Sequence, residues 1–81
     1  MVNSVHTKRY QILKHLLIEA RKAKGLSQAE LADVLGRVQT FVSKYERGER
    51  RLDIIEFIDV TSALDIAAVK VFRKILAADE V

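Results

Sequence analysis

The amino-acid sequence predicts an all-α fold of five short helices. Apolar residues recur at intervals of three and four, residues typical of helix starts and stops stand at the ends of these runs, and no segment alternates with period two over a useful length. The 81 residues suffice for one domain, 1–81, and a domain of this size has a marginal hydrophobic core. We therefore expect one compact helical domain.

The first helix is expected to begin after Thr7, a good N-cap residue, and to run to Lys24. Gly25 follows, and glycine suits the left-handed conformation that closes many helices. One face of this segment is apolar and is formed by Tyr10, Leu13, Leu17 and Ala20. The spacing therefore predicts an amphipathic helix with one face in the core.

The second and third helices are expected to be short. Ser27, followed three residues later by Glu30, has the spacing of a capping box, in which each side chain hydrogen-bonds to the other residue's backbone amide. The helix that begins there stops at Gly36, and a further segment, about 38–47, stops at Gly48. Two short helices thus follow each other across a glycine.

The fourth and fifth helices complete the chain. Asp53 and Glu56 repeat the spacing of a capping box and start a helix that continues to about Leu64. We expect Asp65 to cap a fifth helix, over about 66–78, that ends near Ala78.

The segment of about 28–47 has the residue types of two helices that cross steeply through a tight turn. Ala32 suits the crossing because it is small, and Gly36 suits the turn because glycine accepts a positive φ. Apolar contacts between the two helices are expected from Leu31, Leu35, Val42 and Tyr45. Together these features predict a helix-turn-helix.

The segment of about 38–47 separates its residues into two faces at 100° per residue. The polar face consists of Gln39, Thr40, Ser43, Lys44 and Arg47. The opposite face consists of Phe41, Val42 and Tyr45. The polar face lacks acidic residues and carries groups that can donate hydrogen bonds to bases and phosphates, although an ordinary solvated face is the alternative.

Positive charge is concentrated in the first part of the chain. Residues 1–51 hold 11 Lys and Arg against 5 Asp and Glu, whereas residues 52–81 hold 3 against 6, and the net charge is +3. Such asymmetry favours an anionic partner on one side of the domain, and an ordinary charged surface is the other explanation.

Residues 13 to about 65 resemble the phage repressor/Cro-type, or Xre-type, helix-turn-helix family. The stretches that carry the resemblance are Leu26-Ser-Gln-Ala-Glu-Leu-Ala32 and Phe41-Val-Ser-Lys-Tyr-Glu-Arg-Gly-Glu-Arg50. The resemblance implies a lambda-repressor-like fold and a sequence-specific regulator of transcription, expected to be a repressor. It would read the major groove of double-stranded DNA with helix 38–47.

The resemblance also assigns roles to individual residues. The positions that match base-reading residues are Gln39, Thr40, Lys44 and, more weakly, Ser43. The positions that match phosphate-binding residues are Gln28, Arg47, Arg50 and Arg51. Gln28 would also brace Gln39, and Arg21 and Glu46 match an ion pair that ties the first helix to the end of the third.

Three positions leave alternatives open. Val38 stands where the family often has Ser, Thr or Pro, and because valine is a poor N-cap, the start of the third helix is open; a contact with a thymine methyl group is one role for this side chain. Phe41 either packs against the first or fourth helix or contacts DNA. Lys8 and Arg9 form either an arm that reaches phosphate or a frayed end.

The predicted fifth helix raises the question of assembly. Its apolar stripe, Val69, Phe72, Ile75 and Leu76, either closes the bundle or forms a homodimer interface, and dimers suit paired DNA half-sites. A different class of function remains open, namely a protein-interaction module such as an antitoxin that binds a toxin partner.

Other classes of protein are disfavoured. The chain lacks cysteine, a histidine cluster at metal-ligand spacing, a nucleophile–base pair and a glycine-rich phosphate loop. We therefore expect no enzymatic activity, no cofactor and no metal. The polar segment 1–8 and the absence of a long apolar run predict a cytoplasmic protein with no signal peptide or membrane contact.

Overall fold

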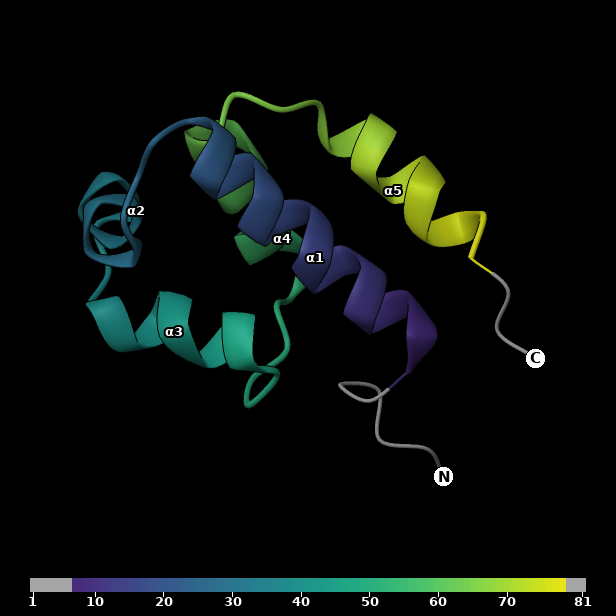
Figure 1. The fold of residues 1–81 in the computed structure, drawn as a ribbon, viewed down its shortest axis with the longest axis horizontal. Coiled ribbons are helices and arrows are strands. Elements are labelled where there is room, and N and C mark those ends of the chain that lie inside the picture. The colour runs from purple at the N-terminus through teal and green to yellow at the C-terminus, as the bar shows by residue number, and fades with distance from the viewer. Residues whose placement is uncertain (1–6, 79–81) are drawn as a thin grey trace.

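The computed structural model describes residues 7–78, and these residues form five α-helices and no strands, which confirms the predicted all-α fold. The helices are α1 (Lys8–Ala23), α2 (Gln28–Leu35), α3 (Gln39–Arg47), α4 (Ile54–Ala63) and α5 (Ala68–Leu76). In Figure 1, α1 crosses in front of α4, α2 and α3 lie together on one side, and α5 runs beside α1 on the other. The arrangement leaves one long side of α3 uncovered.

The hydrophobic core lies where the first four helices meet. Leu17 of α1, Leu31 of α2, Val42 and Tyr45 of α3 and Val60 of α4 are almost completely buried. Their spacing in the sequence places one apolar stripe on each helix, and each stripe faces this centre. The core therefore fixes the position of α3 relative to α1, α2 and α4.

The helix starts follow the local sequence signals. The Thr7 hydroxyl accepts a hydrogen bond from the Tyr10 amide at 3.2 Å, so the predicted cap of α1 is present. Both predicted capping boxes are also present, Ser27 with Glu30 at α2 and Asp53 with Glu56 at α4. These caps satisfy amides that have no partner within their helices.

The start of the fifth helix corrects the sequence prediction. Asp65 does not cap α5; it lies in the left-handed region at φ +56° and closes α4. The Asp65 amide donates to the Ser62 carbonyl and the Ile66 amide donates to the Thr61 carbonyl, each at 3.1 Å. This pair of bonds forms the closing turn that glycine usually occupies.

The chain needs a left-handed residue at this point, and aspartate tolerates that conformation better than most residues other than glycine. Lys24, at the end of α1, donates a hydrogen bond to the Asp65 carboxylate and thereby holds the turn against α1. α5 begins only at Ala68, after Ala67, which provides no side-chain cap.

Within residues 7–78, no helix is long and apolar enough to cross a bilayer. The same part of the chain contains no group of three or more His, Asp or Glu side chains that could hold a metal ion.

Candidate nucleic-acid interface

The uncovered side of α3 carries the residues predicted to read DNA. Gln39, Thr40 and Lys44 are exposed, and Ser43 is half-buried with its hydroxyl donating to the Thr40 carbonyl at 3.3 Å. The other side of the same helix is buried and consists of Phe41, Val42, Tyr45 and Glu46. The two faces deduced from helical spacing are therefore both present.

The turn before α3 sets the angle at which this face is presented. Gly36 has φ +68°, a conformation that is strained for residues with a Cβ. Ala32 is buried at the crossing of α2 and α3, and its small side chain lets the two helices approach. α3 begins at Gln39, and Val38 is its N-cap residue without a side-chain hydrogen bond.

One end of α3 is held by a group of side chains around Glu46, which we call the Glu46 clamp. The Arg21 guanidinium meets the Glu46 carboxylate in a bidentate ion pair, with Nε–Oε2 at 2.8 Å and Nη2–Oε1 at 3.1 Å. The Gln28 amide donates to Glu46 Oε1 at 2.8 Å, and Arg21 also donates to the Leu26 carbonyl at 2.8 Å. The clamp thus joins the end of α3 to α1 and α2.

The Glu46 clamp is largely shielded from solvent. The side chains of Arg21 and Glu46 are 12% and 5% exposed, respectively. The hydrogen bond with Glu46 raises the pKa of Arg21 above its ordinary value. Within the described residues, the side-chain hydrogen bond of Gln28 runs to Glu46 and not to Gln39, so the expected bracing of Gln39 is replaced by bracing of the far end of the same helix.

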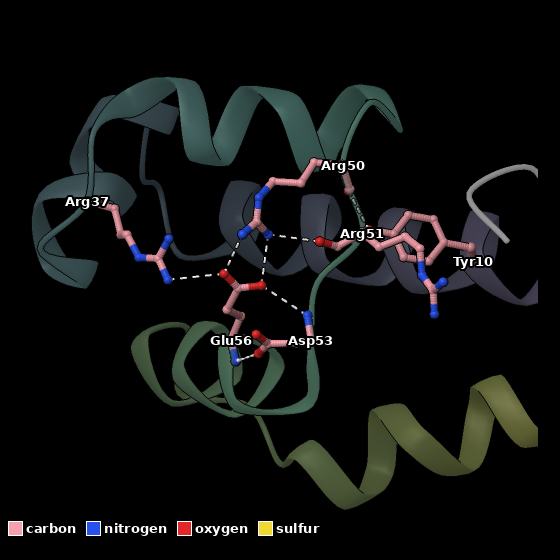
Figure 2. Close-up of polar contacts among 6 residues, drawn as sticks. All are labelled: Tyr10, Arg37, Arg50, Arg51, Asp53 and Glu56. Carbon is pink, nitrogen blue, oxygen red and sulfur yellow. Dashed lines mark hydrogen bonds and ion pairs between the residues drawn. The ribbon is translucent and has the colours of Figure 1, made fainter. Parts of the chain in front are cut away.

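The turn before α3 and the loop after it are both held by Glu56, which lies in the first turn of α4, and we call this group the Glu56 clamp (Figure 2). Arg50 reaches both oxygens of Glu56, with Nη1–Oε1 at 2.8 Å and Nη2–Oε2 at 2.7 Å. Arg37, from the turn before α3, donates to Oε2 at 3.1 Å. The Asp53 amide donates to Oε1 at 2.9 Å.

Glu56 therefore combines a capping box with two ion pairs. The hydrogen bond from Arg50, above all other contacts, lowers the pKa of Glu56 to about 2. The Glu56 clamp is more exposed to solvent than the Glu46 clamp, because the side chains of Arg37 and Arg50 are 43% and 38% exposed. The sequence assigned Glu56 only to the capping box and did not point to Arg37. Arg37 and Arg50 do not lie three or four residues from Glu56, so helical spacing does not predict these ion pairs.

Phe41 packs within the protein. Its ring lies under two guanidinium groups, with the Cζ atoms of Arg37 and Arg50 at 4.3 and 5.0 Å from the ring centroid. Tyr45 contacts the ring edge at a centroid distance of 5.6 Å. Of the two roles left open by the sequence, the structure shows the packing role, and the cation–π contacts link Phe41 to the Glu56 clamp.

The arginines predicted to bind phosphate differ in their surroundings. Arg47 is exposed and pairs with Glu49, with Nε–Oε2 at 2.7 Å. Both terminal nitrogens of Arg50 are engaged by Glu56. Arg51 is exposed and forms no ion pair within residues 7–78. Of the three, Arg51 is therefore the one that the described fold leaves available.

The possible N-terminal arm is absent from the described part of the chain. Lys8 and Arg9 form the first turn of α1, so neither the arm nor the frayed end describes them. Tyr10 anchors this turn, because its hydroxyl donates to the Arg50 carbonyl at 2.8 Å. The start of α1 is thereby connected to the loop that carries Arg50 and Arg51.

A second surface is apolar and lies on α4 and α5. On α5, Val69, Phe72 and Leu76 are exposed by 50% or more, Ile75 is half-buried, and Val71 faces the core. Sequence reasoning missed the contribution of α4, where the exposed residues are Ile54, Ile55 and Ile58. Ile54 and Phe72 line one hollow of about 210 Å³, so the two helices share a surface, which we call the apolar α4–α5 surface.

Comparisons with known proteins agree with this architecture. A helix-turn-helix family model matches residues 17–71. An XRE-family like protein from Pseudomonas syringae pv. tomato str. DC3000 is 49% identical, with a TM-score of 0.84 over 91% of this chain and 90% of that one. No curated protein matches the sequence.

Two other solved structures are similar. The restriction-modification controller protein C.AhdI from Aeromonas hydrophila is 36% identical, with a TM-score of 0.69 over 75% of this chain and 92% of that one. The controller C.Esp1396I, solved as a tetramer with its natural operator, is 22% identical with a TM-score of 0.77, over 88% of this chain and 93% of that one, and shares the fold. The chain belongs to the Xre-type helix-turn-helix family of DNA-binding transcriptional regulators.

Proposed function

We propose that the protein is a homodimeric repressor that binds a specific double-stranded DNA sequence by inserting α3 into the major groove. The observation that carries this proposal is the exposed, acid-free face of α3 on a helix clamped at both ends. A helix that reads bases in the groove must hold its side chains close to the geometry that binds DNA. The two clamps would restrict the movement of α3 in this way.

The base-reading residues proposed on this face are Gln39, Thr40 and Lys44. Glutamine can bond bidentately to adenine, lysine can donate to the acceptors of guanine, and threonine can serve either a base or a phosphate. Ser43 has a smaller proposed role, because the residue is half-buried and its hydroxyl already donates to the Thr40 carbonyl.

The proposed phosphate contacts come from residues beside this face. Arg51 and Arg47 are exposed, and Gln28 lies at the start of α2. Arg50 is expected to contribute less than its neighbour, because Glu56 both holds its guanidinium and offsets its charge. These contacts would set the register on the duplex and not the sequence preference.

The apolar α4–α5 surface supports the homodimer. Exposed contiguous apolar side chains are uncommon on monomers and mark interaction sites. A two-fold dimer through this surface would present two copies of α3 to half-sites about 34–36 Å apart. The same fold, in C.Esp1396I, has been solved as a tetramer on DNA.

The test is selection of bound duplexes from a random DNA pool at physiological salt. We expect an enriched inverted repeat, and we expect Gln39→Ala to bind it more weakly by about 1–3 kcal/mol and to relax the preference at one base pair. If no sequence is enriched, the proposal is overturned. That result would favour a protein-interaction module, such as an antitoxin that binds a toxin partner.

Repression is tested separately by transcription in vitro from a promoter that overlaps the selected repeat. Transcript levels should fall as the protein is added and should not fall with Gln39→Ala at the same concentration. A rise in transcript would show that the protein is an activator.

A further inference from the structure

The side chain of Val38 lies outside the hydrophobic core of residues 7–78. Val38 is the N-cap residue of α3, with φ −76° and ψ 154°, and its side chain makes no capping hydrogen bond. It is also 71% exposed, the largest value among the exposed large apolar residues of the described range 7–78. The N-cap position is one where Ser, Thr, Asn or Asp stabilises a helix, so valine there leaves a helix amide without a side-chain partner.

The neighbours of Val38 leave it at the tip of α3. Arg37 turns back toward the protein, with Nη2 at 3.1 Å from Glu56 Oε2 and Cζ at 4.3 Å from the Phe41 ring centroid (Figure 2). Gln39 and Thr40, the next two residues, are exposed. The end of the helix therefore presents an isopropyl group beside two polar side chains.

Recognition helices contact base edges with their N-terminal residues, which is where Val38 lies. In the major groove, the C5-methyl group of thymine is the one apolar group on a base edge, and it pairs well with apolar side chains. Valine cannot donate a hydrogen bond to phosphate, so an apolar contact is what it can offer DNA.

We propose that Val38 is a specificity-determining residue that contacts the C5-methyl group of a thymine in each half-site. The inference rests on the proposed function, because it requires α3 to bind a specific sequence. It assigns to Val38 a preference for one thymine, distinct from the hydrogen bonds proposed for Gln39, Thr40 and Lys44.

The test uses the selected operator with each thymine replaced, one position at a time, by deoxyuridine, which lacks only the C5-methyl group. We expect one position per half-site at which this replacement weakens binding of the wild-type protein about fourfold, the effect of one buried methyl group. Val38→Ala should bind the thymine operator more weakly and should not distinguish thymine from uracil at that position.

Val34→Ala is the matched control, because Val34 is 61% exposed at the end of α2 and loses the same two methyl groups. It should keep the wild-type preference for thymine. Val38→Thr retains one methyl group and restores a capping oxygen, so it should keep part of the preference. Thermal unfolding of each variant verifies that it is folded.

The outcomes separate the two proposals. Specific binding that tolerates uracil at every position, or an equal uracil effect in wild type and Val38→Ala, would overturn the role of Val38 and leave the proposed function standing. Failure to bind any sequence specifically would overturn both. Loss of the uracil effect in Val38→Ala alone would support the inference.

Discussion

The two clamps at the ends of α3 use the same chemistry in different surroundings. In the Glu46 clamp, the carboxylate belongs to α3 itself and the paired side chains are 12% and 5% exposed. In the Glu56 clamp, the carboxylate belongs to α4, and its arginine partners are 43% and 38% exposed. The difference determines the effect of removing a carboxylate. A buried arginine loses the counter-charge that it has within residues 7–78, whereas a half-exposed arginine can be hydrated.

The clamps also differ in what they position. The Glu46 clamp ties the last turn of α3 to α1 and α2 through Arg21 and Gln28. The Glu56 clamp fixes the turn before α3 through Arg37 and the loop after it through Arg50. We expect the first to govern the stability of the fold and the second to govern both stability and the geometry of the DNA-binding face.

The largest expected effect is that of Glu46→Ala. Removing this carboxylate leaves Arg21 nearly buried without the counter-charge that Glu46 provides, and we expect the free energy of unfolding to fall by about 3–4 kcal/mol. Urea denaturation measures this loss. Glu49→Ala is the control, since Glu49 and its partner Arg47 are both exposed and solvent screens their ion pair, so this variant should leave stability nearly unchanged. An equal effect of the two variants would show that the buried pair has no special role.

Glu56→Ala is expected to destabilise the protein less, by about 2–3 kcal/mol, because water can reach both arginines. Glu56→Gln should cost less again, since glutamine can still complete the capping box. Asp59→Ala, an exposed residue on the same helix, controls for the change in charge. A larger loss for Glu56→Ala than for Glu46→Ala would reverse the comparison.

The Glu56 clamp should also be visible in the pH dependence of stability. The pKa of Glu56 is lowered to about 2 from an ordinary value of 4.5, so the native state favours the ionised carboxylate. The stabilisation is therefore complete above about pH 5 and is lost as the pH falls toward 2. We expect the stability difference between wild type and Glu56→Gln, about 2 kcal/mol at neutral pH, to vanish near pH 2. A pH-independent difference would argue against this ionisation.

Arg50 and Arg51 sharpen the comparison because they are adjacent and only one belongs to a clamp. Arg50→Ala should lower the free energy of unfolding by about 1–2 kcal/mol. Arg51→Ala should leave stability nearly unchanged and reduce the salt dependence of DNA binding by about one counterion. Parallel urea and salt titrations measure both quantities. If Arg50→Ala altered only DNA binding, its pairing with Glu56 would be irrelevant to the fold.

The smallest expected effect concerns Tyr45, which precedes Glu46. Its hydroxyl is buried and has no hydrogen-bond partner among residues 7–78, and burial raises the pKa of Tyr45. Tyr45→Phe removes the unsatisfied group while keeping the ring, so we expect a change between none and a stabilisation of about 1 kcal/mol. Thermal unfolding checks the sign. A loss above 1 kcal/mol would mean that the hydroxyl has a partner, such as a bound water molecule.

Much of the fold could be predicted because its signals are local. A capping box depends on residues three positions apart, as at Ser27 and Glu30, and the helical faces depend on intervals of three and four. The start of α5 could not be predicted in this way. An aspartate commonly serves as an N-cap and only occasionally as a left-handed closing residue, and Asp65 takes the second role.

The candidate site divides along the same line. The exposed positions of Gln39, Thr40 and Lys44 follow from helical spacing, and their roles in reading bases stay predictions. The sequence by itself determined which faces of the helices are apolar, where most helices begin and end, and through resemblance the pair Arg21–Glu46. Only the tertiary structure decided that Arg37 and Arg50 converge on Glu56. Which carboxylate an arginine pairs with depends on the distance between the two groups and on their burial, and the packing of the helices sets both quantities.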